Sequence, residues 1–499
     1  MTQGRVSAPV AGVPERRCGE VTDATAVRAG RRLARPVATG LVGGSLGAAG
    51  SLVWAAAAGR LDRVPLLNGP AAVVIECLGA VALIGSWWST DRRWVRRTLP
   101  LITTGSAVAT VLLAAMLNLS GTVTDEYPPS FAVWVGLVFV ALVGLPLVLR
   151  AQRGAVRGRL RRIAAATAVP LTMLGTLMLI DNEYGVWPQV GDLLGHNHAV
   201  SGGALSGFDH TAYGSTAALS VRRPATLENG LVVALDPPGT SSHFRHRAGV
   251  VYLPPVYFRS VTMDLPVLIM LGGSPGTPLD WMRAGGAEAT VKSYAATHHG
   301  VAPVLIAVDI NGSITGDSEC VNGPQGNVET YLTEDVPAFM TATLHLRRNP
   351  ARWGVVGFSE GGTCALDLAV THQGMFRHFV DLSGDTKPSL GGPHHTLTAL
   401  FGGSRRAQQA HDPLRALATH RYPNTTGWFA AGAADSEAIL IAHRMSAAAQ
   451  NAGITQHELT VAGGHDWRFA AAAFAQILPQ LCTDMGCGVT TVTPRGSPT

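Results

Sequence analysis

Hydrophobic and polar positions divide the chain into two parts with different periodicities. Within the first 180 residues, long apolar runs alternate with short polar segments that are rich in arginine. A helix needs about 20 predominantly apolar residues to cross a bilayer, and each run approaches that length. We therefore predict five transmembrane helices within 36–180. Their apolar runs lie at 36–58, 66–88, 98–118, 131–149 and 163–180.

The second part has the pattern of an α/β protein. After a mixed segment at 181–228, which predicts a linker with a short helix, apolar runs of strand length alternate with segments of helical spacing. This alternation indicates a mainly parallel sheet covered by helices on both faces. We expect one α/β domain over 229–485, ahead of a flexible tail at 486–499. The predicted strands are 230–235, 249–253, 266–271, 303–308, 353–358, 378–382, 427–431 and 456–461, and the predicted helices are 329–347, 361–372, 435–451 and 467–480.

Composition supports a chain that is partly embedded in a membrane. Of the 499 residues, 47% are hydrophobic and only 14% are charged, whereas soluble proteins carry about 25% charged residues. Such a composition excludes a disordered chain, because it can bury a large apolar surface. The formal net charge is +5, but the arginines cluster in short tracts beside the apolar runs. That distribution is typical of membrane proteins and does not indicate a nucleic-acid partner.

The arginine tracts also predict how the helices are oriented. Arginine is concentrated in the N-terminal arm at 1–35, in the loop after the second run and in the loop at 150–162. Lysine and arginine in short loops are retained on the cytoplasmic side of the membrane. The alternation predicts a cytoplasmic N-terminus and, after five crossings, an extracytoplasmic domain beyond Asp181. Glu76 lies near the middle of the second run, where it is either a functional group or a hydrogen-bonded packing residue.

The pattern G-x-S-x-G, which is typical of serine hydrolases, occurs three times, around Ser45, Ser274 and Ser359. Ser45 lies in the first apolar run, and Ser274 precedes a proline-containing loop that delays any helix. Ser359 instead follows a predicted buried strand and precedes an Ala/Leu-rich helix. A strand, a tight turn and a helix are the arrangement that exposes a serine hydroxyl above a sheet edge. We therefore predict that Ser359 is the nucleophile.

A serine nucleophile needs a base, and the base needs an orienting carboxylate. Hydrolases of this kind have the chain order Ser, acid, His. His465 follows the last predicted strand and is preferred over His394 and His395, which lie in a Gly/Pro loop. Asp435 directly follows the seventh strand and is the preferred acid. Glu437 is the alternative acid, and either carboxylate could instead serve as a helix N-terminal charge.

Acyl transfer also requires backbone donors for the developing oxyanion. One predicted donor is the amide of Glu360, directly after the nucleophile. The other belongs to the loop after the third strand, where it is the amide of Ser274 or of Gly273. The two glycines of that loop allow its backbone to approach a substrate.

The stretch 328–337, followed by Gly354–Ser359, resembles the esterase D / antigen 85 mycolyltransferase group of α/β-hydrolases. The segment Gly463–Trp467 is similar to the histidine loop of that group. The resemblance covers roughly 230–480 and leaves the five-helix region outside it. It implies an α/β-hydrolase fold and a carboxylic-ester hydrolase or acyltransferase with a Ser/acid/His triad.

Four of the six cysteines lie beyond Asp181, where the predicted topology permits disulfides. Cys482 and Cys487 are close enough for a small loop, and Cys320 would then pair with Cys364. Four cysteines allow three pairings, and the sequence does not choose between them. No Cys-x-x-Cys or spaced histidine set indicates a metal site, and no cofactor is expected.

Three classes of function remain. The first is a membrane-anchored serine ester hydrolase or acyltransferase that faces outward and acts on a lipid or cell-envelope ester. The second is a catalytically silent hydrolase fold used for binding, and the third is an accessory domain of a membrane transport or signalling protein. A complete predicted triad favours the enzyme. The acyl group, the acceptor (water or an alcohol) and the oligomeric state do not follow from the sequence.

Overall fold

The computed structural model describes residues 64–67, 69–88, 92–120, 129–151, 156–193, 230–258 and 264–487. Four predicted segments lie wholly or largely outside the described residues: the arm at 1–35, the apolar run at 36–58, the linker from 194 onward and the tail from 488 onward.

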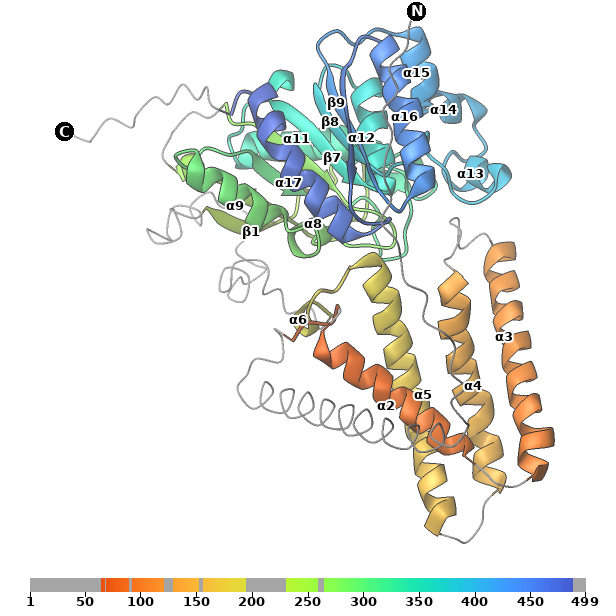
Figure 1. The fold of residues 1–499 in the computed structure, drawn as a ribbon. Coiled ribbons are helices and arrows are strands. Elements are labelled where there is room, and N and C mark those ends of the chain that lie inside the picture. Colours follow the sequence, from red (N-terminus) through yellow and green to blue (C-terminus); the bar gives the residue numbers. More distant parts are fainter. Residues whose placement is uncertain are drawn as a thin grey trace, which may run out of the picture. The chain divides into compact units, whose positions relative to one another are not determined.

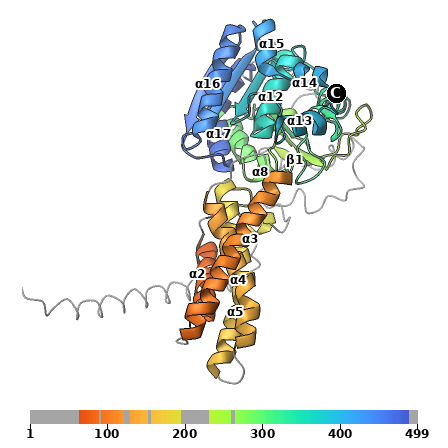
Figure 2. The ribbon, with the colours of Figure 1, turned by 90° about the vertical axis from the view of Figure 1, so that its right-hand side faces the viewer.

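The other four predicted runs form helices that are long and apolar enough to cross a membrane. Their neighbours in the bundle are α2 with α5, α5 with α4 and α4 with α3, and the four helices lie side by side in Figures 1 and 2. A π-helical turn, η2, directly precedes α3. The bounds are α2 Pro70–Trp87, η2 Trp94–Thr98, α3 Leu99–Ser120, α4 Pro129–Ala151 and α5 Val156–Tyr184.

Two arginine tracts that the sequence analysis places in loops belong to helix ends instead. Arg92–Arg97 already lies in the helical turns that lead into α3, and α5 begins at Val156 rather than near 163. The buried Arg161 explains why α5 extends so far. Its Nε and Nη2 donate to the Ser86 carbonyl of α2 at 3.1 and 3.0 Å, and its guanidinium lies 4.8 Å from the centre of the Trp94 ring. Arg161 thereby satisfies a carbonyl at the C-terminus of α2.

Small residues allow α2 and α5 to approach each other closely. A Cβ added at Gly79 of α2 would meet Leu171 of α5 at 3.5 Å, and one added at Gly175 of α5 would meet Glu76 at 3.7 Å. Such small-residue contacts are typical of packed membrane helices. Glu76 therefore lies against α5 within the bundle.

The second part of the chain forms an eight-stranded sheet in the order β1-β2-β4-β3-β7-β8-β9-β10. β2 is antiparallel to β1 and β4, and the remaining strands are parallel. This strand order, with helices on both faces, is the α/β-hydrolase fold. The strands are β1 Leu231–Leu235, β2 Gly249–Leu253, β3 Val267–Leu271, β4 Val304–Ala307, β7 Trp353–Phe358, β8 His378–Leu382, β9 Thr426–Gly432 and β10 Thr455–Val461, close to the eight predicted runs.

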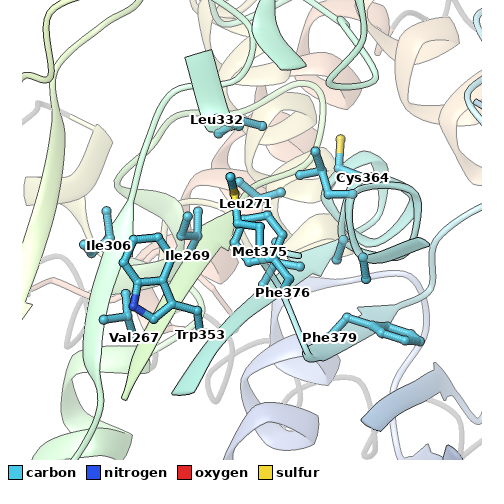
Figure 3. Close-up of a cluster of buried hydrophobic side chains, with 14 of the residues drawn as sticks. Val267, Ile269, Leu271, Ile306, Leu332, Trp353, Cys364, Met375, Phe376 and Phe379 are labelled. Carbon is cyan, nitrogen blue, oxygen red and sulfur yellow. The ribbon is translucent and has the colours of Figure 1, made fainter. Parts of the chain in front are cut away.

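Each face of the sheet has its own hydrophobic core. Along β3, Val267, Ile269 and Leu271 belong to one core, and the intervening Leu268 and Met270 belong to the other. A strand buried on both faces needs apolar residues at nearly every position, and for this reason inner strands such as β3 and β4 are continuous apolar runs. Figure 3 shows part of the first core, where Trp353 lies beside residues of β3.

Helices cover both faces of the sheet (Figure 1). The first core contains residues of α11, α12 and α16, and the second contains residues of α8, α9 and α17. The helices α9 and α13 are not predicted from the sequence, and His394 and His395 lie in α13 rather than in a loop because Pro393 begins that helix. The bounds are α8 Asp280–Arg283, α9 Ala287–Thr297, α11 Val336–Thr343, α12 Glu360–Thr371, α13 Pro393–Ala399, α16 Ser436–Asn451 and α17 Trp467–Asp484.

Candidate active site

The turn after β7 carries the serine that the sequence analysis selects as nucleophile. Ser359 has φ 58° and ψ −123°, a positive-φ conformation that is uncommon for a residue with a side chain. Its amide donates to the Leu382 carbonyl of β8 at 2.9 Å. Glycine is required on both sides, because a Cβ at Gly357 would collide with the Gly361 carbonyl and one at Gly361 with the Leu271 carbonyl. The turn therefore holds Ser359 at the carboxyl edge of the sheet.

Three side chains from three loops form a continuous hydrogen-bonded chain. The Oγ of Ser359 lies 2.9 Å from Nε2 of His465, and Nδ1 of His465 lies 3.0 Å from Oδ2 of Asp435. The loops follow β7, β10 and β9, whose carboxyl ends meet at one edge of the parallel sheet. The His465 side chain is 39% exposed, so the arrangement is accessible to a substrate. The structure thus brings the three selected residues together.

Asp435 has a second contact that fixes its orientation. Its Oδ1 accepts a hydrogen bond from the Ala438 amide at 3.0 Å and caps the N-terminus of α16. Burial raises the pKa of Asp435, but the hydrogen bonds from His465 and Ala438 outweigh burial and hold that pKa below its ordinary value. Glu437, the alternative acid, is exposed in the first turn of the same helix. The carboxylate that contacts the imidazole is therefore that of Asp435.

The residues that follow His465 hold its loop in place. Asp466 caps α17 by accepting a hydrogen bond from the Phe469 amide at 2.9 Å. The Phe358 ring, from the end of β7, lies 5.1 Å from the His465 ring and 5.0 Å from the Trp467 ring between centroids. The helix cap and the ring contacts together restrict the position of the imidazole beside Ser359.

The two backbone segments selected as oxyanion donors lie on either side of the nucleophile. A Cβ on Gly273 would lie 3.6 Å from the Oγ of Ser359, so the loop after β3 passes directly beside the hydroxyl. Ser274 is the next residue in that loop. Glu360 is the first residue of α12, and the first amides of a helix have no partner within the helix. Both segments that the sequence analysis selects as oxyanion donors therefore lie next to Ser359.

Sequence reasoning missed a polar cluster behind the loop after β3. Asp309 is 1% exposed and pairs with Arg247 through two hydrogen bonds, Nη2 to Oδ1 at 2.6 Å and Nε to Oδ2 at 2.9 Å. Together with Asn311, these residues line a small pocket beside Gly272 and Gly273. The available signal was that Asp309 follows a predicted strand at its carboxyl end.

The side chain of Glu360 was also missed, because the sequence assigns that residue only a backbone role. Glu360 is 7% exposed and Glu319 is 4% exposed. Burial raises the pKa of both carboxyls well above the ordinary value, and the neighbouring charge of Asp317 raises each further. The nucleophile is therefore followed by a buried acidic side chain with partners of its own.

The cysteines form one of the two predicted disulfides. Cys320 and Cys364 are bonded, and the bond joins the segment before β5 (Asn322–Gly323) to α12. Cys482 and Cys487 are buried thiols in the structure, and a backbone hydrogen bond of 2.8 Å from the Cys487 amide to the Cys482 carbonyl closes the turn between them. Their disulfide stays a prediction. Within the described ranges, no group of three or more His, Cys, Asp or Glu side chains could hold a metal ion.

Comparison with known proteins places this geometry among esterases. The Esterase family model matches residues 241–481. An uncharacterised protein of Corynebacterium glutamicum is 32% identical over 324 residues, which cover 62% of this chain and 74% of that protein. The diacylglycerol acyltransferase/mycolyltransferase Ag85A of Mycobacterium ulcerans is 29% identical over 207 residues, which cover 38% of this chain and 58% of that protein. Among solved structures, a ferulic acid esterase matches 52% of this chain and 99% of its own length, with 18% identity and a TM-score of 0.44.

Proposed function

The chain belongs to the Esterase family of α/β-hydrolases, and we propose that it is a membrane-anchored serine enzyme whose catalytic domain lies outside the cytoplasm. Family membership makes it a carboxylic-ester hydrolase or acyltransferase. The observation that carries the catalytic proposal is the hydrogen-bonded chain from Ser359 through His465 to Asp435, with distances of 2.9 and 3.0 Å. Its proposed substrate is a lipid or cell-envelope ester.

In the proposed first half-reaction, Ser359 is acylated. Nε2 of His465 accepts the hydroxyl proton while the Oγ attacks the ester carbonyl, and Asp435 stabilises the imidazolium that forms. The oxyanion accepts hydrogen bonds from the Glu360 amide and from the amide of Gly273 or Ser274. The imidazolium then donates its proton to the leaving alkoxide, which departs as an alcohol.

The second half-reaction reverses these roles with a new acceptor. His465 deprotonates water or an alcohol, which attacks the acyl group on Ser359. The bond between the acyl carbon and the Ser359 Oγ then breaks, and the imidazolium returns its proton to that oxygen. Water gives a free carboxylic acid, and an alcohol gives a new ester. Asp435 remains ionised in both steps, because its pKa is held below the ordinary value.

The substrate class is supported by the other part of the chain. Four described helices are long and apolar enough to cross a membrane, and tethering raises the effective concentration of a membrane-resident ester at the catalytic domain. The Mycobacterium ulcerans relative is named a diacylglycerol acyltransferase and mycolyltransferase, and acyl transfer to a diacylglycerol fits this arrangement. The arginine pattern of the sequence supports the proposed outward orientation.

Labelling with a fluorophosphonate tests the catalytic proposal. We expect the full-length wild type to be labelled at Ser359 and the Ser359→Ala variant to remain unlabelled. A folded wild type that resists the probe would instead support a silent binding module or an accessory transport domain.

A reporter fusion tests the orientation. A reporter placed after Thr499 should be active only outside the cytoplasm, and one placed within 150–162 only inside. A cytoplasmic C-terminus would contradict the proposed topology and the compartment that it gives the cysteines.

Reconstitution tests the substrate class. We expect the protein to turn over a lipid ester in its own vesicle faster than the same ester in separate vesicles, whereas a soluble p-nitrophenyl ester should show no such difference. Equal rates on both vesicle populations would argue against tethered access to the substrate.

A further inference from the structure

One loop connects the two segments that supply the oxyanion donors. We define the bridge loop as residues 309–320, which follow β4 and end at the disulfide cysteine Cys320. On one side it contacts the loop after β3, which carries Gly273 and Ser274. On the other side it contacts the start of α12, which carries Glu360.

The contacts to the loop after β3 are direct hydrogen bonds. The Gly276 amide donates to the Ile314 carbonyl at 3.0 Å, and the Ser274 Oγ donates to the Gly316 carbonyl at 2.8 Å. Because Ser274 carries one of the two candidate donors, the position of that donor depends on where the bridge loop lies.

The Arg247–Asp309 pair fixes the beginning of the bridge loop. Asp309 accepts hydrogen bonds from the Asn311 and Gly312 amides, both at 3.1 Å. Arg247, held by Asp309, donates from Nη1 to the Gly276 carbonyl at 2.9 Å. The buried Asp309 therefore shapes the bridge loop and, through Arg247, also holds the loop after β3.

The contacts to α12 come from the side chain of Glu360. Its Oε2 accepts a hydrogen bond from Nδ2 of Asn311 at 2.7 Å. Its Oε1 accepts from the amides of Ser318 and Glu319, both at 3.1 Å. The Cys320–Cys364 disulfide ties the same end of the bridge loop to the same helix. The residue that offers one oxyanion amide thus also holds the loop that positions the other.

A buried carboxyl at this position needs a reason, because the proposed chemistry uses only the Glu360 amide. Burying an acidic group is costly, and an apolar side chain of similar volume would fill the space at lower cost. The three hydrogen bonds satisfy the carboxyl, and they place it at the contact between the bridge loop and α12. A position that links two catalytic segments is where such a cost would be offset by function.

We propose that the side chain of Glu360 is a positioning group that sets the separation of the two oxyanion donors through the bridge loop. This inference rests on the proposed serine-hydrolase function and concerns what holds the two donors of its oxyanion hole at the correct separation. Small displacements of catalytic groups are expensive, since a misplacement of about 1 Å can reduce a rate by roughly 100-fold.

The test compares an ester with its thionoester, in which sulfur replaces the carbonyl oxygen. Sulfur is a weak hydrogen-bond acceptor, so the ratio of the two kcat values reports use of the oxyanion hole. In the full-length protein, Glu360→Ala should lower kcat for a p-nitrophenyl ester by about 10- to 100-fold with little change in KM. The ester-to-thionoester ratio should fall by a similar factor. Glu360→Gln should lie between Glu360→Ala and wild type, because its amide oxygen can still accept from Ser318 and Glu319.

Asp367→Asn is the matched control. Asp367 lies on the same helix, is 2% exposed and contacts His411 rather than the bridge loop. It should lower thermal stability but leave the ester-to-thionoester ratio unchanged. A ratio that falls equally in both variants would mean that general loosening of α12 is responsible, and this would overturn the inference.

A second variant decides the matter if the Glu360 variants do not fold. Asn311→Ala removes one donor to Glu360 and should lower the ratio by about threefold, the effect of one ordinary hydrogen bond. If Asn311→Ala or Glu360→Ala is folded and active and keeps the wild-type ester-to-thionoester ratio, the positioning role of Glu360 is wrong, whereas the proposed serine-hydrolase function stands. A wild type without Ser359-dependent ester turnover would overturn the proposed function as well.

Discussion

The helical bundle and the hydrolase domain treat large apolar side chains in opposite ways. In α2–α5, side chains such as Val81 and Val111 are 67% and 68% exposed. In the described part of the hydrolase domain, the exposed large hydrophobic side chains are those of Ile314 and Leu440, which are 48% and 70% exposed. The two regions therefore carry opposite surfaces, one suited to lipid and the other to water.

The polar side chains of the two regions also make different kinds of contact. In the bundle, a threonine hydroxyl donates to a carbonyl one turn earlier in its own helix, as Thr110 does to Ser106 at 2.9 Å. In the hydrolase domain, polar side chains connect distant segments, as Asp309 and Arg247 do. Where a bundle side chain links two helices, as Arg161 does, it donates to a backbone carbonyl, whereas the hydrolase domain also pairs distant polar side chains with one another.

The largest expected effect tests whether catalysis belongs to the hydrolase domain alone. Ser359→Ala and His465→Ala should each reduce kcat/KM for a p-nitrophenyl ester by about 10⁴-fold or more, because each removes a member of the triad. Asp435→Asn should cost more than Glu437→Gln. Steady-state kinetics of the reconstituted protein measure these changes, with membrane insertion as the unaffected control. The opposite ranking of the two acids would assign the orienting role to Glu437.

The next effect compares one substitution on the two surfaces. Val111 in α3 and Leu440 in α16 are 68% and 70% exposed. Val111→Arg should disfavour insertion of α3 by about 2.5–3.5 kcal/mol if the side chain faces lipid. Leu440→Arg should change stability by less than about 0.5 kcal/mol, because it exchanges one water-exposed side chain for another. Protease protection in vesicles measures insertion of α3, and thermal unfolding measures the stability of the hydrolase domain. If Val111→Arg inserts as well as the wild type, the exposed side chains of the bundle do not face lipid.

A smaller effect concerns the exposed apolar side chain beside the site. Ile314 is 48% exposed, and its carbonyl accepts the Gly276 amide in the loop after β3. Ile314→Ser should lower kcat/KM for long-chain esters about threefold relative to short ones, because partial burial of an isoleucine against an acyl chain is lost. Leu440→Ser provides the control and should leave the chain-length profile unchanged. If the dependence of kcat/KM on ester chain length is the same in Ile314→Ser and the wild type, the Ile314 side chain does not contact the acyl chain.

The smallest effect is a pH dependence of the stability of the hydrolase domain. Burial lowers the pKa of His411, but the hydrogen bond that His411 donates to Asp367 and the charges of Asp367 and Glu329 outweigh burial and raise that pKa above its ordinary value. A histidine with a raised folded pKa contributes stability below its unfolded pKa and loses that contribution as pH rises through the folded pKa. The Tm difference between wild type and His411→Gln should therefore shrink as pH rises from about 6 to about 9. A constant difference would show that the ion pair does not titrate in this window.

Much of the fold was predictable because it depends on local pattern. Inner strands such as β3, β4 and β7 are continuous apolar runs, because a strand buried on both faces needs an apolar residue at nearly every position. Ser359 and His465 could be located because each directly follows a strand, so their positions along the chain reveal their place at the sheet edge. The helix α13 was missed because it is short and begins with Pro393 directly after two glycines, a pattern that favours a loop.

The supporting residues were not predictable because their partners are distant in sequence. Arg247 and Asp309 are 62 positions apart, and Asn311 and Glu360 are 49 apart. No local spacing encodes those contacts. The extension of α5 to include Arg161 likewise depends on the Ser86 carbonyl, which lies 75 positions earlier.

The position of His465 after the last strand has a consequence for the timing of synthesis. The described helices of the bundle end at Tyr184, and roughly 280 further residues separate them from the imidazole. At about 5–20 residues per second, a ribosome needs on the order of 15–60 seconds to add them. Ser359 is added before His465, so until then the proposed nucleophile lacks its base, and the nascent chain should be inert toward esters while the apolar helices are inserted. A product truncated before β10 would keep the four apolar helices and Ser359 but would lack the base of the proposed triad.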